Sequence, residues 1–495
     1  MKVVLKRTRV FMLLAFALLP AGCAVGPDYR SPSLDLPTRW SGDKNKREPQ
    51  PPVLAQWWRR LNDPLLNQLI DEAVQGNLDV AAAKARIREA RASRRQAIGA
   101  LFPSIEGSGS ATRSRTATTT TDDITTPPST GNQFQAGFDA SWELDLFGAN
   151  RRAVEAATYN VDASEDDLRS TLLTLIGDVA SYYVDARGYQ ARAALARRTA
   201  ISQRETAALT QNKFNAGSAS AVDTAKALAQ AASTEANVPT NEASYRESLH
   251  RLGVLLGRDP TALASRLARV TPIPAPRLPL PRGIPADVLT MRPDVRKAER
   301  QLAQYTAKIG QAEAALYPDV SLSGSVSTTA LKLGDLGKNS TIGWSFGPTV
   351  SVPIFNGGKL RAAVEVAEAQ RDEYHVAWRS AVLTALEDVE NATVSLAQER
   401  IKIRSLTESA QRYGEAARLS HTLYENGSSS FLDVLDAERS QFSAEDTLLQ
   451  SRVNIAKDYV ALAKALGGGW DGAIDAGKPE VVDTDTGPHL PGALR

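Results

Sequence analysis

The chain has 495 residues, of which 42% are hydrophobic and 23% are charged, and its formal net charge is +2 at pH 7. This length allows two or three domains, and the near-neutral charge gives no reason to expect nucleic acid as a partner. Cys23 is the one cysteine in the sequence, so an internal disulfide bond is excluded.

The first residues have the pattern of a secretory signal. Basic residues between Lys2 and Arg9 precede the apolar run VFMLLAFALLPAG, which ends in small residues. This run is too short to span a membrane as a helix, and no later stretch has the ~18 consecutive apolar residues that a spanning helix needs. The sequence therefore predicts a signal peptide over residues 1–22.

The cysteine stands directly after this signal. LLPAGC resembles a bacterial lipoprotein cleavage site, which would make Cys23 the lipid-carrying first residue of the mature chain. Pro20 stands where leucine is more usual, and Ala24, instead of aspartate, matches lipoproteins that are sorted to the outer membrane. An ordinary signal peptide with a cysteine nearby is the alternative. We predict lipidation, with residues 23–59 as a lipid-anchored N-terminal segment.

The rest of the chain reads as two copies of one unit. NLDVAAAKARIREARASRRQAIGALFPSI aligns with RPDVRKAERQLAQYTAKIGQAEAALYPDV, and both Asp79 to Asp294 and Pro103 to Pro318 are separated by 215 positions. LDLFGANRRAVEAA and VPIFNGGKLRAAVEVA form a second aligned pair in the same order. Repeats of this kind define the organisation of a chain. The predicted parts are repeat 1 at 60–257, a Pro-rich linker at 258–283, repeat 2 at 284–467 and a C-terminal tail at 468–495.

Each repeat contains two segments with strand periodicity. In FQAGFDASWEL, which begins at Phe134, every second residue is apolar, so one face is apolar and the other polar. Strands about ten residues long with this pattern suit a transmembrane barrel, and a half-buried sheet in a soluble sandwich is the alternative. The predicted strands are at about 103–113, 133–146, 318–328 and 342–355.

Long Ala-rich helices follow the strands. Two of them would each extend about 100 Å, and no single core could bury them, so we expect them to pack on one another as coiled coils. Gly177 and Gly188 are predicted joints in the first, and Pro239 is a predicted kink in a returning helix. The predicted helices are Gly148–Phe214, Ala221–Leu256, Lys359–Tyr424 and Phe431–Leu466.

The same turn occurs twice between these helices. KFNAGSASAVDTAKA and LYENGSSSFLDVLDAE share an aromatic residue, a glycine, small hydroxyl residues and an aspartate. Gly217 and Gly427 are 210 positions apart, as are Asp223 and Asp433. Glycine suits the turn backbone, and an aspartate near a helix N-terminus is by itself most simply a cap or a solvated residue.

One chain supplies too few strands to close a barrel. The smallest closed bacterial barrels have about eight strands, and an open edge in lipid leaves backbone groups unpaired. Two chains would give eight strands and a filled interior, whereas three would give twelve and a lumen.

Several motifs together resemble the outer membrane factor family, the TolC-like channels, in the lipoprotein branch typified by OprM and NodT. The motifs are GCAVGPDYRSP, FPSI, YPDV, IFNGGKLRA and NGSSSFLDVLDAERS. The resemblance implies a mixed α and β membrane protein with an internal duplication. It implies a homotrimer with a 12-stranded outer-membrane β-barrel continuous with a long periplasmic α-helical barrel.

The implied function is that of an exit duct in a tripartite efflux pump. Drugs or other small toxic solutes would pass from an inner-membrane RND-type transporter and a periplasmic adaptor to the outside. The protein would lie among outer-membrane lipids, carry a covalent lipid on Cys23 and need no other cofactor or metal.

The resemblance also implies a periplasmic gate. Asp433 and Asp436 match the aspartates that ring the closed entrance, and they share one helix face because they are three residues apart. Held close in three copies, these carboxylates would repel, raise some of their pKa values and favour cations. Tyr424 and Asp223 match positions that bridge neighbouring coils. Ser429 replaces an arginine that locks the gate in one relative.

The turn residues are implied to dock the adaptor. Glycine itself serves the turn backbone, and the residues beside it form the tip. The implied docking residues are Gly217, Ser218, Gly427, Ser428 and Ser429.

Three other functions remain as alternatives. A type I protein-secretion duct would have the same architecture. A lipid-anchored periplasmic hydrolase is raised by GWSFG, but Ser345 falls in mid-strand without the strand-to-helix turn of a nucleophile elbow. A structural coiled coil or adhesin would not need the strands. The four histidines show no metal-binding spacing, so no enzyme is predicted.

Overall fold

The computed structural model describes residues 24–34, 37, 40, 54–117, 119–121, 124–126, 128–276 and 291–477. The predicted signal peptide 1–22, Cys23, most of the N-terminal segment, residues 277–283 of the linker and residues 478–495 of the tail lie outside this part. The described chain forms two compact units. The strand unit consists of residues 24–33, 89–163 and 298–378, and the helical unit of the remaining described residues.

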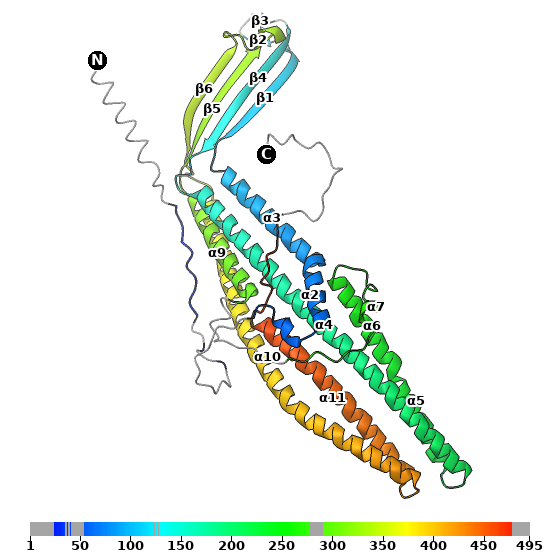
Figure 1. The fold of residues 1–495 in the computed structure, drawn as a ribbon. Helices are drawn as coiled ribbons and strands as arrows, with labels where there is room; N and C mark the ends of the chain where they lie inside the picture. Colours follow the sequence, from blue (N-terminus) through cyan, green and yellow to red (C-terminus); the bar gives the residue numbers. More distant parts are fainter. Residues whose placement is uncertain are drawn as a thin grey trace. The chain divides into compact units, whose positions relative to one another are not determined.

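A four-stranded antiparallel sheet dominates the strand unit (Figure 1). Its strands run in the order β1, β4, β5, β6, and a small β2–β3 hairpin forms a separate sheet that the sequence did not predict. β6 ends at Ser351, so the prediction of a strand to residue 355 was too long at that end. The strands are β1 Ser104–Arg115, β2 Thr119–Thr121, β3 Ile124–Thr126, β4 Thr130–Glu143, β5 Asp319–Ala330 and β6 Ile342–Ser351.

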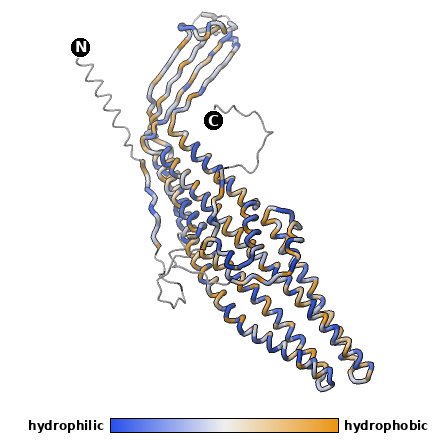
Figure 2. Tube along the Cα trace, viewed as in Figure 1, coloured by the Kyte–Doolittle hydropathy of each residue, from blue (hydrophilic) through white to orange (hydrophobic). Residues whose placement is uncertain are grey.

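The register keeps the two faces of this sheet chemically distinct. Phe138 pairs with Val326, and Val326 pairs with Trp344, which forms an apolar row across three strands. In the next row Asp139 pairs with Ser325, and Ser325 pairs with Ser345. The apolar row is exposed, with Trp344 at 78%, and Figure 2 shows the alternation along the strands. The period of two predicted from the sequence therefore holds across the sheet.

Both edges of the sheet are open within the described residues. β1 pairs with β4 alone, and β6 pairs with β5 alone. Each outer strand therefore presents a row of backbone N–H and C=O groups to a further strand.

The N-terminal segment is fastened to the start of α4 (Ala149–Asn215) in the strand unit. The Val25 amide donates to the Phe147 carbonyl at 3.1 Å. The buried Arg152 guanidinium donates to the Val25 and Gly26 carbonyls at 3.1 and 3.0 Å and pairs with Asp28 at 2.9 Å. The residues that follow Cys23 are thus held close to the end of β4.

Two helical hairpins form most of the helical unit (Figure 1). The first hairpin consists of α4, α5 (Ala221–Glu235) and α6 (Asn237–Leu255), and the second of α10 (Lys359–Glu425) and α11 (Phe431–Ala465). α4 and α11 are joined by a bidentate Arg192–Asp446 ion pair at 2.7 and 2.9 Å. No described helix is long and apolar enough to cross a membrane.

The prediction of joints at Gly177 and Gly188 is wrong, because α4 is continuous through both. Both glycines instead face α11. A Cβ atom on Gly188 would lie 2.4 Å from the Val453 side chain, and one on Gly177 would lie 3.4 Å from the Lys464 side chain. The absent side chains allow close helix packing, which is why glycine at these positions does not signal a bend.

The predicted kink at Pro239 is confirmed. α5 ends at Glu235, Ala236 is a turn, and α6 begins at Asn237. Proline has no N–H for the carbonyl four residues earlier, and its ring clashes with that carbonyl. The helix returning from the first turn is therefore interrupted, whereas α11 is continuous.

Shorter helices complete the fold. α2 and α3 are separate because the Asn77 side chain caps α3, a break that the sequence analysis did not predict.

Trp57 and Trp58 are fully buried, and Trp58 stacks on Trp470 with ring centroids 6.1 Å apart, so the segments before and after the repeats pack together. The short helix α7 interrupts the predicted linker. The bounds are η1 Trp57–Leu61, α2 Pro64–Gly76, α3 Leu78–Gly99, α7 Ala264–Leu267, α9 Pro293–Ala314 and η2 Leu333–Asp335.

Candidate gate at the hairpin turns

The two hairpin turns have the same backbone geometry. Gly217 and Gly427 both have φ of 77°, in the left-handed region that favours glycine. After the first helix the Ser218 amide donates to the Lys213 carbonyl at 2.8 Å, and after the second the Ser428 amide donates to the Leu423 carbonyl at 2.8 Å. These are Schellman motifs, which satisfy the last carbonyls of a helix. The repeated sequence therefore encodes one turn built twice.

A capping box starts the returning helix in each hairpin. Ser220 caps α5 with Asp223, and Ser430 caps α11 with Asp433, so that each serine side chain accepts an amide N–H and each aspartate bonds back to the serine. The aspartates stand three residues after the caps, which is the position a capping box requires. The cap reading of the two aspartates is thus correct as local structure.

Asp433 has an additional partner in Ser429. The Ser429 hydroxyl donates to the Asp433 carboxylate at 2.8 Å, and the Ser430 hydroxyl donates to the same oxygen at 2.8 Å. These bonds, with the Ser430 amide, lower the pKa of Asp433. Within one chain, Asp433 is therefore held ionised, and Asp436 lies exposed one turn further along α11. Both predicted ring residues are on the exposed side of this helix.

Tyr424 lies on the opposite, buried side of the second turn. Its side chain is 5% exposed, its ring packs edge-on against Phe431, and its hydroxyl donates to the Thr210 hydroxyl at 3.2 Å. The predicted bridge from Tyr424 to Asp223 is not formed in the described chain. The capping box occupies the Asp223 carboxylate, and the Tyr424 hydroxyl bonds to α4 instead.

A second link between the hairpins was missed by the sequence analysis. The Thr206 hydroxyl lies 2.7 Å from a carboxyl oxygen of Glu438. Burial raises the pKa of Glu438, and the Thr206 hydrogen bond partly opposes that effect. A Thr-x₃-Thr spacing on a helix, opposite a glutamate among apolar residues, was the available signal. An apolar cluster surrounds the links, formed by Ala207, Ala227, Tyr424, Phe431, Val434 and Leu435.

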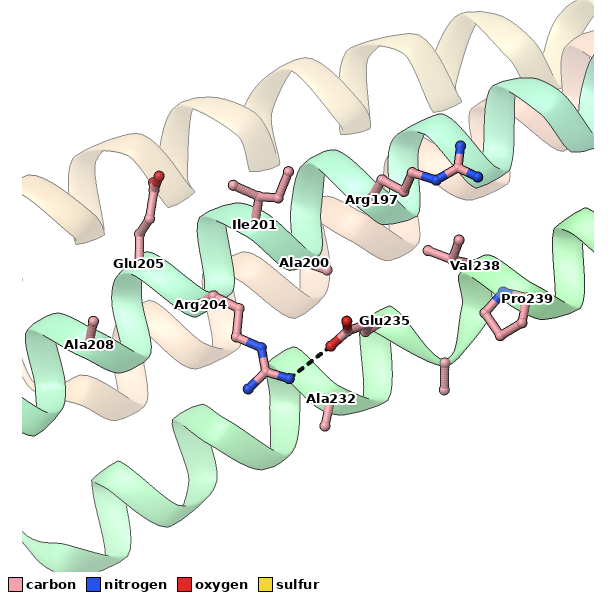
Figure 3. A pocket seen from close by; sticks show the side chains of 11 residues that line it. Arg197, Ala200, Ile201, Arg204, Glu205, Ala208, Ala232, Glu235, Val238 and Pro239 are labelled. Carbon is pink, nitrogen blue, oxygen red and sulfur yellow. Dashed lines mark hydrogen bonds and ion pairs between the residues drawn. The ribbon is translucent and has the colours of Figure 1, made fainter. Parts of the chain in front are cut away.

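A groove of about 950 Å³ lies beside the α5–α6 break (Figure 3). Arg204 pairs with Glu235 across it at 2.8 Å, and Pro239 lies at one end. The small side chains of Ala200, Ala208 and Ala232 leave the space between α4 and the returning helices. In the second hairpin the returning helix, α11, is continuous from Phe431 to Ala465.

Ser345, which raised the hydrolase alternative, lies in the middle of β6. Its hydroxyl is 2.9 Å from the Ser325 hydroxyl on the polar face of the sheet. No described group of three or more His, Cys, Asp or Glu residues could hold a metal ion.

Comparison with known proteins gives one consistent result. The model of the outer membrane efflux protein family matches residues 69–258 and 284–468. Nodulation protein T of Rhizobium leguminosarum bv. trifolii is 38% identical over 93% of this chain and 98% of its own length. The solvent efflux pump outer membrane protein SrpC of Pseudomonas putida is 32% identical over 92% of this chain and 97% of its own.

A solved structure agrees with these sequence relatives. The outer-membrane channel OprN superposes with a TM-score of 0.83 at 35% identity, covering 90% of this chain and 100% of that one. The open state of the MtrE outer membrane channel of Neisseria gonorrhoeae also superposes, with a TM-score of 0.78 at 30% identity, covering 90% of this chain and 98% of that one. With both repeats matched and the fold shared, the chain belongs to the outer membrane efflux protein family.

Proposed function

We infer that this protein is the exit duct of a tripartite efflux pump and passes small toxic solutes from a periplasmic adaptor and an inner-membrane transporter of the RND type to the outside. The observation that carries this inference is the family match over both repeats, on a chain that joins an amphipathic sheet to two long hairpins. One relative is named as part of a solvent efflux pump, which supports small apolar solutes as cargo.

The sheet favours a homotrimer. Its open β1 and β6 edges would leave backbone groups unpaired in lipid, at several kcal/mol each by the general penalty for unsatisfied groups. Because β1 and β6 run in opposite directions within the antiparallel sheet, β6 of one copy can pair with β1 of the next. Three copies of four strands then close a barrel with a lumen.

A stripe of exposed apolar residues on α10 supports the same assembly. Leu383, Val394, Ile401 and Leu419 are all at least 47% exposed. They are 11, 7 and 18 residues apart, and these intervals return to nearly the same side of a 3.6-residue helix. A straight apolar stripe in the helical unit is a surface for the helices of a neighbouring copy.

Asp433 and Asp436 are proposed to form the charged entrance. They occupy the exposed side of α11 just after the second turn, and three copies would place six carboxylates there. The Ser429 hydroxyl keeps the Asp433 carboxylate ionised and oriented, a different arrangement from an arginine lock. Such a ring would attract cations to the pore.

The two turns are proposed as the adaptor-docking tips. Ser218, Ser428 and Ser429 are exposed or partly exposed and stand on rigid Schellman backbones. Because the first and second hairpins differ in their returning helices, a trimer would present two alternating kinds of tip.

The ring is tested in planar bilayers with purified protein. Replacing both ring residues by asparagine (Asp433→Asn, Asp436→Asn) removes the charge with little change of volume and should reduce cation selectivity severalfold. Asp223→Asn is the comparison variant, because it alters the equivalent capping box in the other turn and is the remaining carboxylate of the predicted gate. Unchanged selectivity in the double variant would move the charged constriction elsewhere, and a pure trimer that never conducts would argue against the duct.

The lipid anchor is tested by Cys23→Ser. We expect loss of palmitate labelling and weaker membrane attachment, since attachment grows with the number of acyl chains. The folded trimer should persist, because residues 25–28 are still held by Arg152. Palmitate incorporation that survived the substitution would reject the assignment of Cys23.

A further inference from the structure

We propose that Thr206 and Thr210 of α4 form a hydroxyl latch that holds the second hairpin against the first, and that uptake of a proton by Glu438 favours this closed arrangement of the periplasmic end. This inference rests on the proposed channel function and assigns it a control element. It adds three residues to the candidate gate, none of them among those that sequence reasoning selected.

The latch consists of two parallel links one helical turn apart. Thr206 and Thr210 are 2% and 0% exposed and four residues apart, so their side chains emerge from the same face of α4. Thr210 meets the Tyr424 hydroxyl of α10, and Thr206 meets the Glu438 carboxyl of α11. One face of the first hairpin therefore contacts both helices of the second.

The two links differ in the number of acceptors that the threonine hydroxyl proton must serve. Thr210 donates to the carbonyl of Thr206 at 2.8 Å and accepts from Tyr424 at 3.2 Å, so its one proton and a lone pair are both used. Thr206 lies 3.2 Å from the carbonyl of Ser202 and 2.7 Å from Glu438. A single hydroxyl proton cannot fully serve two acceptors.

The conflict disappears when Glu438 carries a proton. Its O–H then donates to the Thr206 hydroxyl, and Thr206 donates to Ser202, which reproduces the arrangement at Thr210. When Glu438 is ionised, Thr206 must turn its proton toward the carboxylate and weaken its bond to Ser202. The protonated latch thus makes two hydrogen bonds at Thr206, where the ionised latch makes one in full.

The electrostatic surroundings favour the protonated form in the closed arrangement. Burial is the largest influence on Glu438 and raises its pKa, while the Thr206 bond and the charge of His421 on α10 lower it. Several charged groups of the packed helices also have partners other than Glu438. The pairs are His421 with Glu425 on α10, Arg439 of α11 with Gln230 of α5, and Arg198 of α4 with Glu445 of α11.

The raised pKa of Glu438 sets the direction of the pH effect. Opening would expose Glu438 and return its pKa toward the ordinary value, so the closed state binds the proton more tightly. The added stability of closure is fully present below the open-state pKa and is lost as pH rises through the higher closed-state pKa. Acidification should therefore close the channel.

A neighbouring buried side chain, Gln203, destabilises the closed arrangement. Gln203, one turn before Thr206 on α4, is 1% exposed, and its amide oxygen and nitrogen have no hydrogen-bond partner among the described residues. An unsatisfied buried amide opposes closure.

The test measures conductance in planar bilayers between about pH 5 and about pH 8, a range that brackets a raised carboxyl pKa. For wild type, the closed-to-open ratio should rise as pH falls, by at most about tenfold per pH unit for one proton. Glu438→Gln mimics the protonated acid, because its amide N–H can donate to Thr206. It should be mostly closed and show a flattened pH profile.

Variants at the two threonines separate the effect of the hydroxyl bonds from the effect of Glu438 protonation. Thr206→Val and Thr210→Val keep the side-chain shape, remove the hydroxyl and should both open the channel severalfold at every pH. Both should keep a pH response, because Glu438 remains half-buried, and Thr206→Ser should restore closure. Heat-resistant trimers on a gel establish that each variant is assembled.

Two outcomes would overturn the latch. One is a wild-type pH profile in Glu438→Gln, and the other is unchanged closure in both valine variants. Either result would leave the duct intact if wild type and variants conduct with the same ion selectivity. Failure of the proposed function has a different signature, in which assembled trimers, including the valine variants, do not conduct at any pH.

Discussion

Asp433 illustrates how one side chain can serve both fold and channel. Its carboxylate completes the capping box of α11 and accepts two serine hydroxyls, yet it remains on the exposed side of the helix. The cap fixes the direction of the carboxylate, so the ring and the cap are compatible readings of the same residue. Sequence reasoning treated them as competitors because a motif does not say which way a side chain points.

The capping box should respond to acid. The pKa of Asp433 is lowered by its hydrogen bonds, so its stabilising effect is present above the ordinary aspartate pKa and is lost as pH falls through the lowered value. Ser430→Ala should destabilise the second turn by about 1 kcal/mol at neutral pH, and by less in strong acid. Thermal unfolding followed by circular dichroism at both pH values measures this difference.

Ser220→Ala, in the equivalent cap, is the control and should have a similar effect at neutral pH. A Ser430→Ala penalty that stayed constant into strong acid would mean that the carboxylate contributes nothing to this cap.

At the scale of elements, small residues decide how closely the long helices approach. The continuous α4 passes α11 at Gly188, where a Cβ would lie 2.4 Å from Val453, and at Gly177, where the nearest atom is the flexible Lys464 side chain at 3.4 Å. Two glycines in one helix therefore face different obstacles. The β-branched Val453 is stiff at χ1, whereas lysine can move aside.

These two positions make a matched pair. Gly188→Ala should destabilise the protein by about 1–3 kcal/mol, as expected for overpacking. Gly177→Ala should be neutral or stabilising by up to about 1 kcal/mol, because alanine favours the helix. Thermal unfolding of the two variants side by side checks the prediction, and equal effects would contradict the packing explanation.

At the scale of the whole molecule, a chain that leaves both sheet edges open is incomplete. β1 and β6 lack a second partner within the described residues, and the helical stripe on α10 is exposed. Association of three copies would cover both features. The internal duplication places two similar hairpins in each copy, so three copies would enclose the proposed duct with six.

Cysteine cross-linking tests closure between copies. Ser345→Cys on β6, combined in turn with cysteine at Glu106, Ser108 or Ser110 on the polar face of β1, should give covalent dimers and trimers on oxidation. Glu106→Cys with Asp139→Cys is the control, because these two residues pair within one chain and should give monomers only. Monomers from every β1–β6 combination would refute the predicted strand closure.

The sequence by itself determined the repeat, the strand alternation, the long helices, the Pro239 break and the doubled turn. All of these depend on local periodicity or on residues with special backbone preferences, which a single sequence displays directly. The family resemblance rested on the same motifs, and the match to residues 69–258 and 284–468 confirms it.

Only the tertiary structure decided which side chains meet. Gly177 and Gly188 face α11, and the Tyr424 hydroxyl meets Thr210 of α4; neither contact is visible in the sequence. The Thr206–Glu438 link joins residues 232 positions apart. Such contacts depend on the rotation of two helices about their axes, and no local pattern in the chain specifies that rotation.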